Sequence, residues 1–412
     1  MTSEPKEHIY LDQVFTYFKA KPGLLGMLIL ASIFTNFMVS FDVNLYFFSS
    51  PYIISAISAP IIYLGISASS FTLGVIIFAT VGGYLFTNYS IRKLLLLSIA
   101  IITIFSVLTG YVQNVWELVA ARFLFGLGNG LLQGLITSLL GGLHPQKKGF
   151  LLSLKGITFS AGLLFGPYAE SFFAPSYEVP FIITGIVGIV CISLVVLYLP
   201  EIYMRKSHES RLDMKRLFNS NTTRVFLSIF FFGIGLFGML GYFSRFMLSE
   251  LNYSNGQAAL VSSMLGLGGI IMSLPTGHIS DVWSRKLTLA AMFVIMAFSS
   301  IAIFGFHLGY LAMILITLLF GGAYNSLINI VSAAAQELGD SRDIGQLSGS
   351  AFSFYYAGGI LGGPMFGLIL NSSGFKAAGL ITVTVFMVIG LLFTMSIREY
   401  SSRRGTSHVQ KL

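Results

Sequence analysis

The sequence AGLLFGP at positions 161–167 returns about half a chain later as GGILGGP at positions 358–364. Two more matches have nearly the same spacing. The tripeptide LFG at 124–126 matches LFG at 319–321, and Gly83 matches Gly277. Because three matches share nearly one offset, the sequence predicts an internal duplication of two similar halves.

The composition predicts that lipid surrounds most of this chain. Hydrophobic residues make up 55% of the 412 residues and charged residues only 10%, whereas soluble domains carry about 25% charged residues. A soluble protein of this size could not cover its surface with so few charges, so a soluble enzyme is excluded. The 44 glycines also suit closely packed membrane helices.

The apolar segments are long enough to cross a bilayer, since a spanning helix needs about 20 apolar residues. Twelve such runs lie near positions 23–48, 61–87, 94–112, 116–140, 150–173, 179–199, 225–249, 258–279, 287–306, 309–333, 347–370 and 375–396. Helices are the economical way to satisfy so much backbone inside lipid. We predict an all-α membrane protein with twelve transmembrane helices in two six-helix, pseudo-symmetric bundles, related by an axis along the membrane normal.

The predicted divisions follow from the repeat and from the polar stretches. An N-terminal tail (1–22) precedes the first bundle (23–199), and a middle loop (200–224) leads to the second bundle (225–396) and the C-terminal tail (397–412). The first apolar run is too long for the core of a signal peptide, so no cleavable signal is expected.

Most of the 24 lysines and arginines lie in the tails, the middle loop and every second short loop, on one side of the predicted membrane. The positive-inside rule then places both termini in the cytoplasm of a cell-membrane protein. It also explains the net charge of +8 without nucleic acid as a partner. Cys191 is the only cysteine, so it can form neither an internal disulfide nor a zinc site. We expect no metal, no cofactor and a monomer.

Two loop motifs resemble the signature G-x-x-x-D-R-x-G-R-K of the major facilitator superfamily, a family of secondary transporters. The copy in the second half contains Gly277, Asp281, Arg285 and Lys286 at matching positions. The resemblance extends over nearly the whole chain. It implies the major facilitator fold, with these residues in a cytoplasmic gate.

The copy in the first half departs from this pattern. Gly83, Arg92 and Lys93 match, but Thr87 replaces the aspartate on which the family's charge lock is centred. A threonine can form hydrogen bonds but carries no fixed charge. We therefore expect Asp281, with Arg285 and Lys286, to form the charged contact of the gate. The alternative for the basic residues is that they only mark topology.

A second family signature follows Arg122 in the fourth span, where Gly126 and Gly128 permit close helix approach. A third resembles the span-5 motif of proton antiporters. Since it occurs in both halves, we interpret it as helix packing and bending by Gly162, Gly166, Pro167, Gly359, Gly363 and Pro364.

Two opposite charges are predicted within spans at equal depth. Asp42 lies about six residues before the outer end of span 1, and Arg122 about six residues after the outer start of span 4. An unpaired charge at a span centre costs about 2.5–3.5 kcal/mol on insertion scales. We therefore predict that the two pair beside a wet central cavity, with Asp42 as the proton-coupling acid and Arg122 tuning it. The alternative is a purely structural pair.

Three other charged residues fall within or near spans. Arg245 could attract an anionic substrate, or could extend to the outer headgroups beside Glu250. Glu170 is expected at the outer interface, and Lys155 is expected to extend toward the cytoplasm.

Amide side chains are candidate substrate contacts. Asn129 with Gln133, and Asn325 with Asn329, have the i, i+4 spacing that presents one helix face. Asn36 in span 1 and Tyr324 in span 10 are further candidate contacts of the substrate. Buried amides need hydrogen-bond partners, so they either bind the solute or hold helices together.

The leading hypothesis is a proton-coupled transporter of a small organic solute that works by alternating access, most plausibly a metabolite symporter. A proton-coupled multidrug or solute efflux antiporter is the alternative. A transport-dead receptor and a membrane-embedded enzyme are rivals from other classes. The enzyme is disfavoured because the 6 histidines lie in tails, loops or span ends and none pairs at helical spacing. No GxxxxGK[ST] loop for ATP occurs.

Overall fold

The computed structural model describes residues 9–11, 13–19, 22–143, 148–203, 218–338 and 344–398. Most of the predicted tails, much of the middle loop and Arg342 lie outside these ranges. The side chain of Thr87 also lies outside the described part of the chain, so its effect on the gate stays a prediction.

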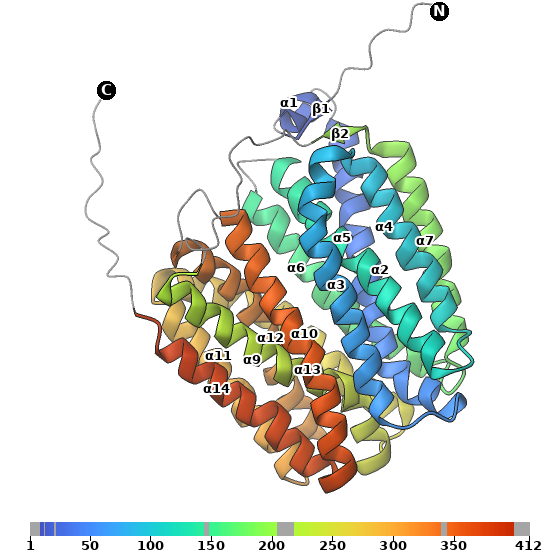
Figure 1. Ribbon diagram of the computed structural model, residues 1–412, viewed down its shortest axis with the longest axis vertical. Coiled ribbons are helices and arrows are strands. Elements are labelled where there is room, and N and C mark those ends of the chain that lie inside the picture. The colour runs from blue at the N-terminus through green and yellow to red at the C-terminus, as the bar shows by residue number, and fades with distance from the viewer. Residues whose placement is uncertain are drawn as a thin grey trace, which may run out of the picture.

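The first half forms a bundle of helices, which we call the N bundle (Figure 1). Its members are α2 (Pro22–Ala56), α3 (Ile62–Asn88), α4 (Ile91–Thr109), α5 (Val115–Leu143), α6 (Lys148–Ser171) and α7 (Glu178–Tyr198). Local polar residues fix where helices begin. Ser90 accepts the Lys93 backbone N–H at the start of α4, and Asn114 accepts those of Trp116 and Glu117 before α5.

The second half forms the C bundle beside it. Its members are α9 (Ser220–Arg245) with the π-turn η2 (Phe246–Glu250), α10 (Asn255–Val282), α11 (Arg285–Gly305), α12 (Tyr310–Leu338), α13 (Ile344–Gly379), η3 (Leu380–Val385) and α14 (Phe386–Met395). Ser254 and Gln257 form a capping box at the start of α10. The chain turns at Gly374, whose φ of 78° an L-residue rarely adopts, so α13 holds one crossing and the start of the next.

Within the described ranges, 10 helices are long and apolar enough to cross a membrane. The last of these spans 47 residues, Gly349–Met395, and includes the turn at Gly374. Helix α6 is not among the 10, but it runs the length of the N bundle (Figure 1). The all-α, two-bundle prediction is confirmed, and a count of twelve crossings stays a prediction.

A small two-stranded sheet lies at one end of the N bundle (Figure 1). Strands β1 (Ile9–Tyr10) and β2 (Ile202–Tyr203) pair in parallel, and the short helix α1 (Val14–Lys19) follows β1. Val14 is fully buried. The chain before α2 is thereby joined to the chain after α7, which sequence periodicity did not predict because each strand has only two residues.

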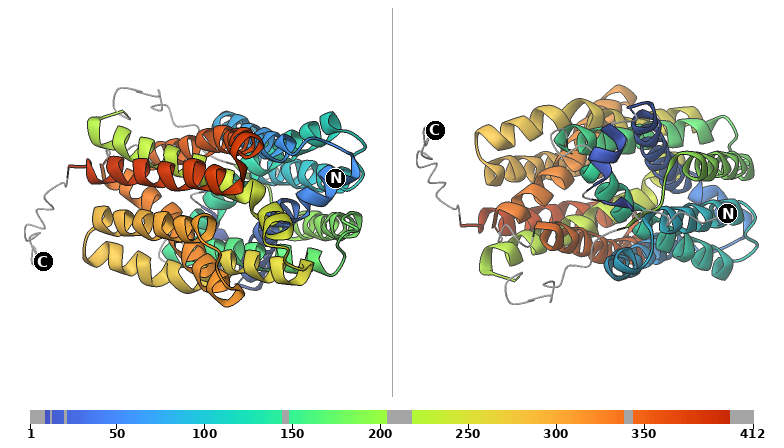
Figure 2. Two further views of the ribbon diagram at one scale, coloured as in Figure 1. Left: turned by 90° about the horizontal axis from the view of Figure 1, so that it is seen from below. Right: turned by 90° about the horizontal axis from the view of Figure 1, so that it is seen from above.

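The two bundles meet along two pairs of helices, α3 with α13 and α6 with α10 (Figures 1 and 2). Glycines make this approach close. A Cβ placed on Gly65 would collide with the backbone of Gly363 and lie 2.8 Å from the nitrogen of Pro364. A Cβ on Gly266 would lie 2.5 Å from the carbonyl oxygen of Ser160. Small residues at these positions therefore hold the halves together.

We call the side that carries Arg92, Lys93, Arg285 and Lys286 the basic side, and the other the opposite side. Hydrogen bonds between the bundles that join described residues lie on the opposite side or near the middle. The Tyr52 hydroxyl donates to Asn255 Oδ1 at 2.7 Å, and Ser244 donates to the carbonyl of Phe48 at 2.9 Å. The structure is therefore closed on the opposite side.

Helix α2 differs from its predicted bounds. The apolar run was predicted to end near position 48, but the helix continues through Pro51 to Ala56. Ser49, Ser50 and Ser55 donate their hydroxyls to carbonyls of the same helix, so these polar side chains do not end it. The predicted depth of Asp42 was therefore counted from position 48, although the helix ends at Ala56.

Candidate functional site

Asp42 of α2 and Arg122 of α5 form an ion pair inside the N bundle. Arg122 Nη1 lies 3.4 Å from Asp42 Oδ1, and both residues are 0% exposed. Ser106 of α4 also donates a hydrogen bond to the Asp42 carboxylate. Three helices therefore converge on one carboxylate.

Aromatic rings surround the guanidinium of Arg122. Its central carbon lies 3.9 Å from the centre of the Tyr46 ring and 4.3 Å from that of Phe125. Tyr46 is itself held by a hydrogen bond from its hydroxyl to Ser67 Oγ at 2.5 Å. Arg122 Nε has no hydrogen-bond partner within the part of the chain that the structure describes. The prediction that this pair faces a wet cavity is wrong for this conformation, because the rings and the bundle core cover both charges.

Three predicted polar residues come together nearer the basic side. Gln133 Nε2 donates to Asn36 Oδ1 at 3.4 Å and to Asn129 Oδ1 at 3.3 Å. Asn36 Nδ2 donates to the carbonyl of Lys155 at 3.0 Å and to Thr158 Oγ1 at 2.9 Å. The amide group of Asn36 is thus committed to joining α2 with α5 and α6.

The polar face of α5 that carries Asn129, Gln133 and Thr137 becomes more exposed toward the basic side. Asn129 is 4% exposed, Gln133 is half-buried and Thr137 is exposed. The same trend occurs on α12, where Asn325 is 6% exposed and Asn329 is exposed. The polar faces of α5 and α12 are therefore more accessible near the basic side than at mid-helix.

The predicted polar residues of the C bundle do not form one cluster. Asn325 donates to the carbonyls of Gly321 at 2.8 Å and Leu265 at 3.3 Å, and accepts from Ser160 of α6 at 3.4 Å. Tyr324 is 2% exposed and stacks beside Phe232. Asn329 lies one turn further along α12, on the exposed part.

Lys155 points toward α5. Its Nζ donates to Thr137 Oγ1 at 2.6 Å and to the carbonyl of Gln133 at 3.4 Å. The expectation that it extends away to the basic side is wrong, because these two acceptors lie within its reach on α5.

The charged residues of the opposite side also differ from expectation. Glu170 is 0% exposed rather than interfacial, and neither carboxylate oxygen forms a hydrogen bond of normal geometry with a described residue. The ends of α6 and α2 cover it, with Ser49 and Tyr52 nearby. Arg245 is half-buried at the end of α9 and forms no ion pair with a described residue, Glu250 included.

The predicted gate residues form contacts within their own halves. Asp281 and Arg285 form an ion pair at 3.0 Å within the α10–α11 connection. Lys93 lies 3.8 Å from Glu201, and Arg92 donates to the carbonyl of Val196 at 2.7 Å. In the part of the chain described, none of these contacts joins the two bundles, as expected where the basic side is open.

The remaining gate positions carry no such contact. Gly83 lies within α3, and Gly277 lies within α10 with open space around it. Lys286 is half-buried near the start of α11.

The predicted packing residues lie at helix contacts. Gly162 and Gly166 of α6 face the backbone of α2 at Phe41, with a Cβ on Gly162 lying 2.5 Å from its nitrogen. Gly359 faces the Phe237 ring of α9, and Gly363 faces Gly65 of α3. Pro167 and Pro364 lie inside α6 and α13.

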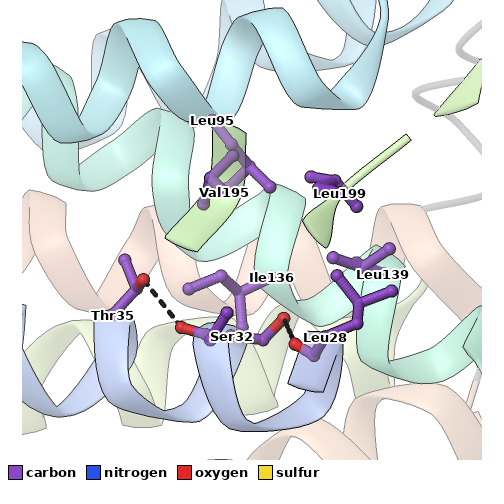
Figure 3. Close-up of a pocket in the computed structure, with 9 residues that line it drawn as sticks. Leu28, Ser32, Thr35, Leu95, Ile136, Leu139, Val195 and Leu199 are labelled. Atoms are coloured by element: carbon purple, nitrogen blue, oxygen red, sulfur yellow. Dashed lines mark hydrogen bonds between the residues drawn. The ribbon is translucent and has the colours of Figure 1, made fainter. Parts of the chain in front are cut away.

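A small pocket within the N bundle is a poor candidate for a solute site (Figure 3). Its lining is mostly aliphatic and includes Leu28, Ile136 and Val195. The hydroxyls of Ser32 and Thr35 donate to carbonyls of their own helix. No group of three His, Cys, Asp or Glu that could hold a metal occurs among the described residues.

Sequence reasoning missed four contributors to these sites. Tyr46 lies four residues after Asp42, on the same helix face, so spacing alone could have suggested it. Ser106 and Thr137 carried no such signal, and Lys155 stood out only as a charge within a span. Their roles depend on which helices become neighbours.

Comparison with known proteins agrees with this architecture. The family model of the Major Facilitator Superfamily matches residues 32–363 and 225–411. A relative named multidrug resistance protein MdtG, from Klebsiella pneumoniae (strain 342), is 22% identical over 75% of this chain and 77% of its own length. A hexuronate transporter from Bacillus subtilis (strain 168) is 23% identical over 79% of this chain and 83% of its own.

Two solved structures share the fold. The nucleoside transporter NupG, as a D323A mutant, superposes with a TM-score of 0.76 and 13% identity, over 90% of this chain and 100% of that one. A D-xylose–proton symporter superposes with a TM-score of 0.75 and 16% identity, over 90% of this chain and 98% of that one. At such identities these similarities establish the fold alone.

Proposed function

Because the chain belongs to the Major Facilitator Superfamily, we propose that it is a proton-coupled secondary transporter, which carries a small organic solute across the cell membrane by alternating access. A family of transporters is not enzymatic, so the membrane-embedded enzyme is set aside. Both termini are proposed to lie in the cytoplasm, on the basic side. The working unit is proposed to be a monomer.

The buried pair of Asp42 and Arg122 carries this proposal. Their charges compensate each other only while Asp42 is ionised, at 3.4 Å and with no exposure to solvent. A proton on Asp42 would remove its charge and free Arg122 to move with α5. The helices that meet at this carboxylate would then be able to change their packing. A proton is thereby linked to the conformation of the N bundle.

The solute is proposed to bind between the bundles, where side chains become accessible from the basic side. The proposed contacts from α2 and α5 are Asn36, Asn129 and Gln133, and those from the C bundle are Tyr324, Asn325, Asn329 and Arg245. Half-buried Gln133 and exposed Asn329 support this location. Asn36 is proposed to hold Gln133 in position, since its own amide already donates two hydrogen bonds.

The gate is proposed to work on the basic side. When that side closes, Asp281 would exchange its local partner Arg285 for contacts between the bundles. The ion pair of Asp281 and Arg285 is partly exposed, with side-chain exposures of 63% and 24%. Exposed pairs contribute little to stability, so this exchange would have a small energetic barrier.

A metabolite symporter is the preferred form of this function. The polar amides on both sides of the bundle boundary suit a hydrogen-bonding solute, and the relative named hexuronate transporter carries such a compound by its name. A multidrug efflux antiporter is the second candidate, supported by the relatives named MdtG and by the Gly162 and Pro167 motif in α6.

Flux in proteoliposomes under an imposed pH gradient tests the function. With one proton per solute, a gradient of one pH unit supports up to about tenfold accumulation, since one unit corresponds to about 1.36 kcal/mol. Asp42→Asn should still equilibrate the solute but should lose gradient-driven accumulation. Glu250→Gln, at an exposed carboxylate on the opposite side, is the control.

Each outcome separates the candidates. Accumulation by Asp42→Asn equal to that of the wild type would rule out Asp42 as the coupling acid. Accumulation of the solute on the side toward which protons flow supports symport. Accumulation on the side from which protons flow supports the antiporter. Solute binding without any flux would identify a transport-dead receptor.

A further inference from the structure

Lys155 is a positive charge within a span, and no carboxylate of the described residues balances it. It lies seven residues after the start of α6, about 10 Å from the basic end of the helix. Its Nζ contacts two neutral groups, Thr137 Oγ1 at 2.6 Å and the carbonyl oxygen of Gln133 at 3.4 Å. Its half-buried side chain lies beside the exposed Thr137.

The two buried acidic residues described within the spans, Asp42 and Glu170, do not neutralise Lys155. Asp42 is paired with Arg122. Glu170 lies at the other end of α6, fifteen residues further on, or about 22 Å along the helix. Among the described residues, no carboxylate oxygen lies within ion-pair distance of Lys155. Charges inside a membrane protein normally pair or face a watery path. Since no described carboxylate pairs with Lys155, a ligand anion could balance its charge.

The groups around Lys155 favour an anion that also accepts hydrogen bonds. An ammonium group has three N–H donors, and two of them are used by Thr137 and Gln133. The third is available to a ligand. Asn129, one turn before Gln133 on α5, uses its carbonyl oxygen as an acceptor, and its amide nitrogen donates to no described residue. A solute whose carboxylate contacts Lys155 and whose other polar groups extend toward Asn129 would use both the third N–H of Lys155 and the amide nitrogen of Asn129.

We propose that Lys155 binds the carboxylate of a small organic acid, which is the solute that this transporter carries. This inference rests on the proposed function, whose substrate class it names. A single ammonium balances one negative charge, which matches a monocarboxylate. A phosphate group normally takes several cations or an arginine fork, and a lipophilic cation would be repelled. Lys155 therefore also favours the metabolite transporter over efflux of cationic drugs.

Equilibrium binding to the purified full-length protein tests this proposal. The probes are D-glucuronate, D-gluconate and lactate as carboxylates, D-glucose as a neutral compound, inorganic phosphate, and tetraphenylphosphonium as a cation. At least one carboxylate should raise the apparent Tm of the wild-type protein and bind measurably. Lys155→Met should weaken that binding at least tenfold, whereas Lys155→Arg should retain most of it. Lys376→Met is the control, because this lysine is exposed on the opposite side.

Two results of the binding experiment would overturn the proposal. If Lys155→Met binds the carboxylate as tightly as the wild type, or if only glucose, phosphate or the cation binds, Lys155 is not a carboxylate site. Binding at equilibrium needs no proton gradient, so Asp42→Asn should keep the affinity for the carboxylate. A failure of proton coupling is thereby distinguished from a failure of the anion site.

Discussion

Replacement of Arg122 by methionine should destabilise the protein far more than replacement of both members of its ion pair. Methionine has nearly the length of the arginine stem but no charge, so it leaves the carboxylate of Asp42 buried with Ser106 as its remaining donor. Removal of one partner from a buried pair costs about 3–5 kcal/mol, because an uncompensated charge remains. The double variant Asp42→Asn with Arg122→Met leaves no such charge.

The expected shifts can be estimated from the same contacts. For a chain of this length, each kcal/mol corresponds to about 1–2 °C in Tm, so Arg122→Met should lower the apparent Tm by about 3–10 °C. The double variant should recover at least about 2 °C of that loss. It should not recover all of it, since the ring contacts with Tyr46 and Phe125, at 3.9 and 4.3 Å, are lost in both variants. Each such contact is worth about 0.5–2 kcal/mol.

The assay is the fraction of folded protein that elutes from size exclusion in detergent after heating, with all variants compared at one pH. A second series at lower pH adds a check on the cause, because a proton on Asp42 would relieve the uncompensated charge. The destabilisation by Arg122→Met should therefore shrink as the pH falls. A double variant no more stable than Arg122→Met, with no dependence on pH, would refute the ion-pair reasoning.

Two further predictions concern the packing of the bundles. Gly65→Ala places a methyl group 2.8 Å from the Pro364 nitrogen and should reduce the yield and the apparent Tm, whereas Gly256→Ala, with nothing within 4 Å, should leave both unchanged; equal stability of the two variants would show that α3 and α13 can separate without cost. Glu170→Met removes a buried carboxyl whose oxygens accept no hydrogen bond of normal geometry from the described residues, a feature that costs about 1–3 kcal/mol. It should therefore raise the apparent Tm by a few degrees, and a fall would show that the carboxyl contributes favourable contacts.

The fold could be predicted from the sequence because two strong signals agreed. Long apolar runs specify membrane helices, and the repeated motifs specify two halves of the same kind. The pairing of Asp42 with Arg122 was also predictable, since each would be costly alone. The depth argument behind it was wrong in detail, because α2 continues to Ala56 beyond the predicted end at position 48. The two residues meet although they lie at different distances from their helix ends.

The errors occurred where a side chain could take either of two directions. Lys155 lies near enough to the basic side to extend toward it, and only the position of α5 shows that Thr137 and Gln133 hold it instead. Glu170 near a helix end was read as interfacial, but the far end of α2 covers it. Both outcomes depend on which helices become neighbours. Periodicity along one helix does not contain that information.

The charges inside the N bundle give the proposed cycle a simple balance. The empty protein holds Asp42 against Arg122 and leaves Lys155 positive. One proton on Asp42 adds a positive charge, and one carboxylate at Lys155 adds a negative charge, so the loaded protein carries the same net charge as the empty one. The empty and the loaded protein then differ in which charges pair with each other, and both have the same net charge. The form that holds only the proton carries one more positive charge, and the form that holds only the anion carries one fewer. Since moving net charge through lipid is costly, the carrier that holds only the proton is the form whose reorientation is most hindered. The proposed carrier would thereby limit a leak of protons without solute.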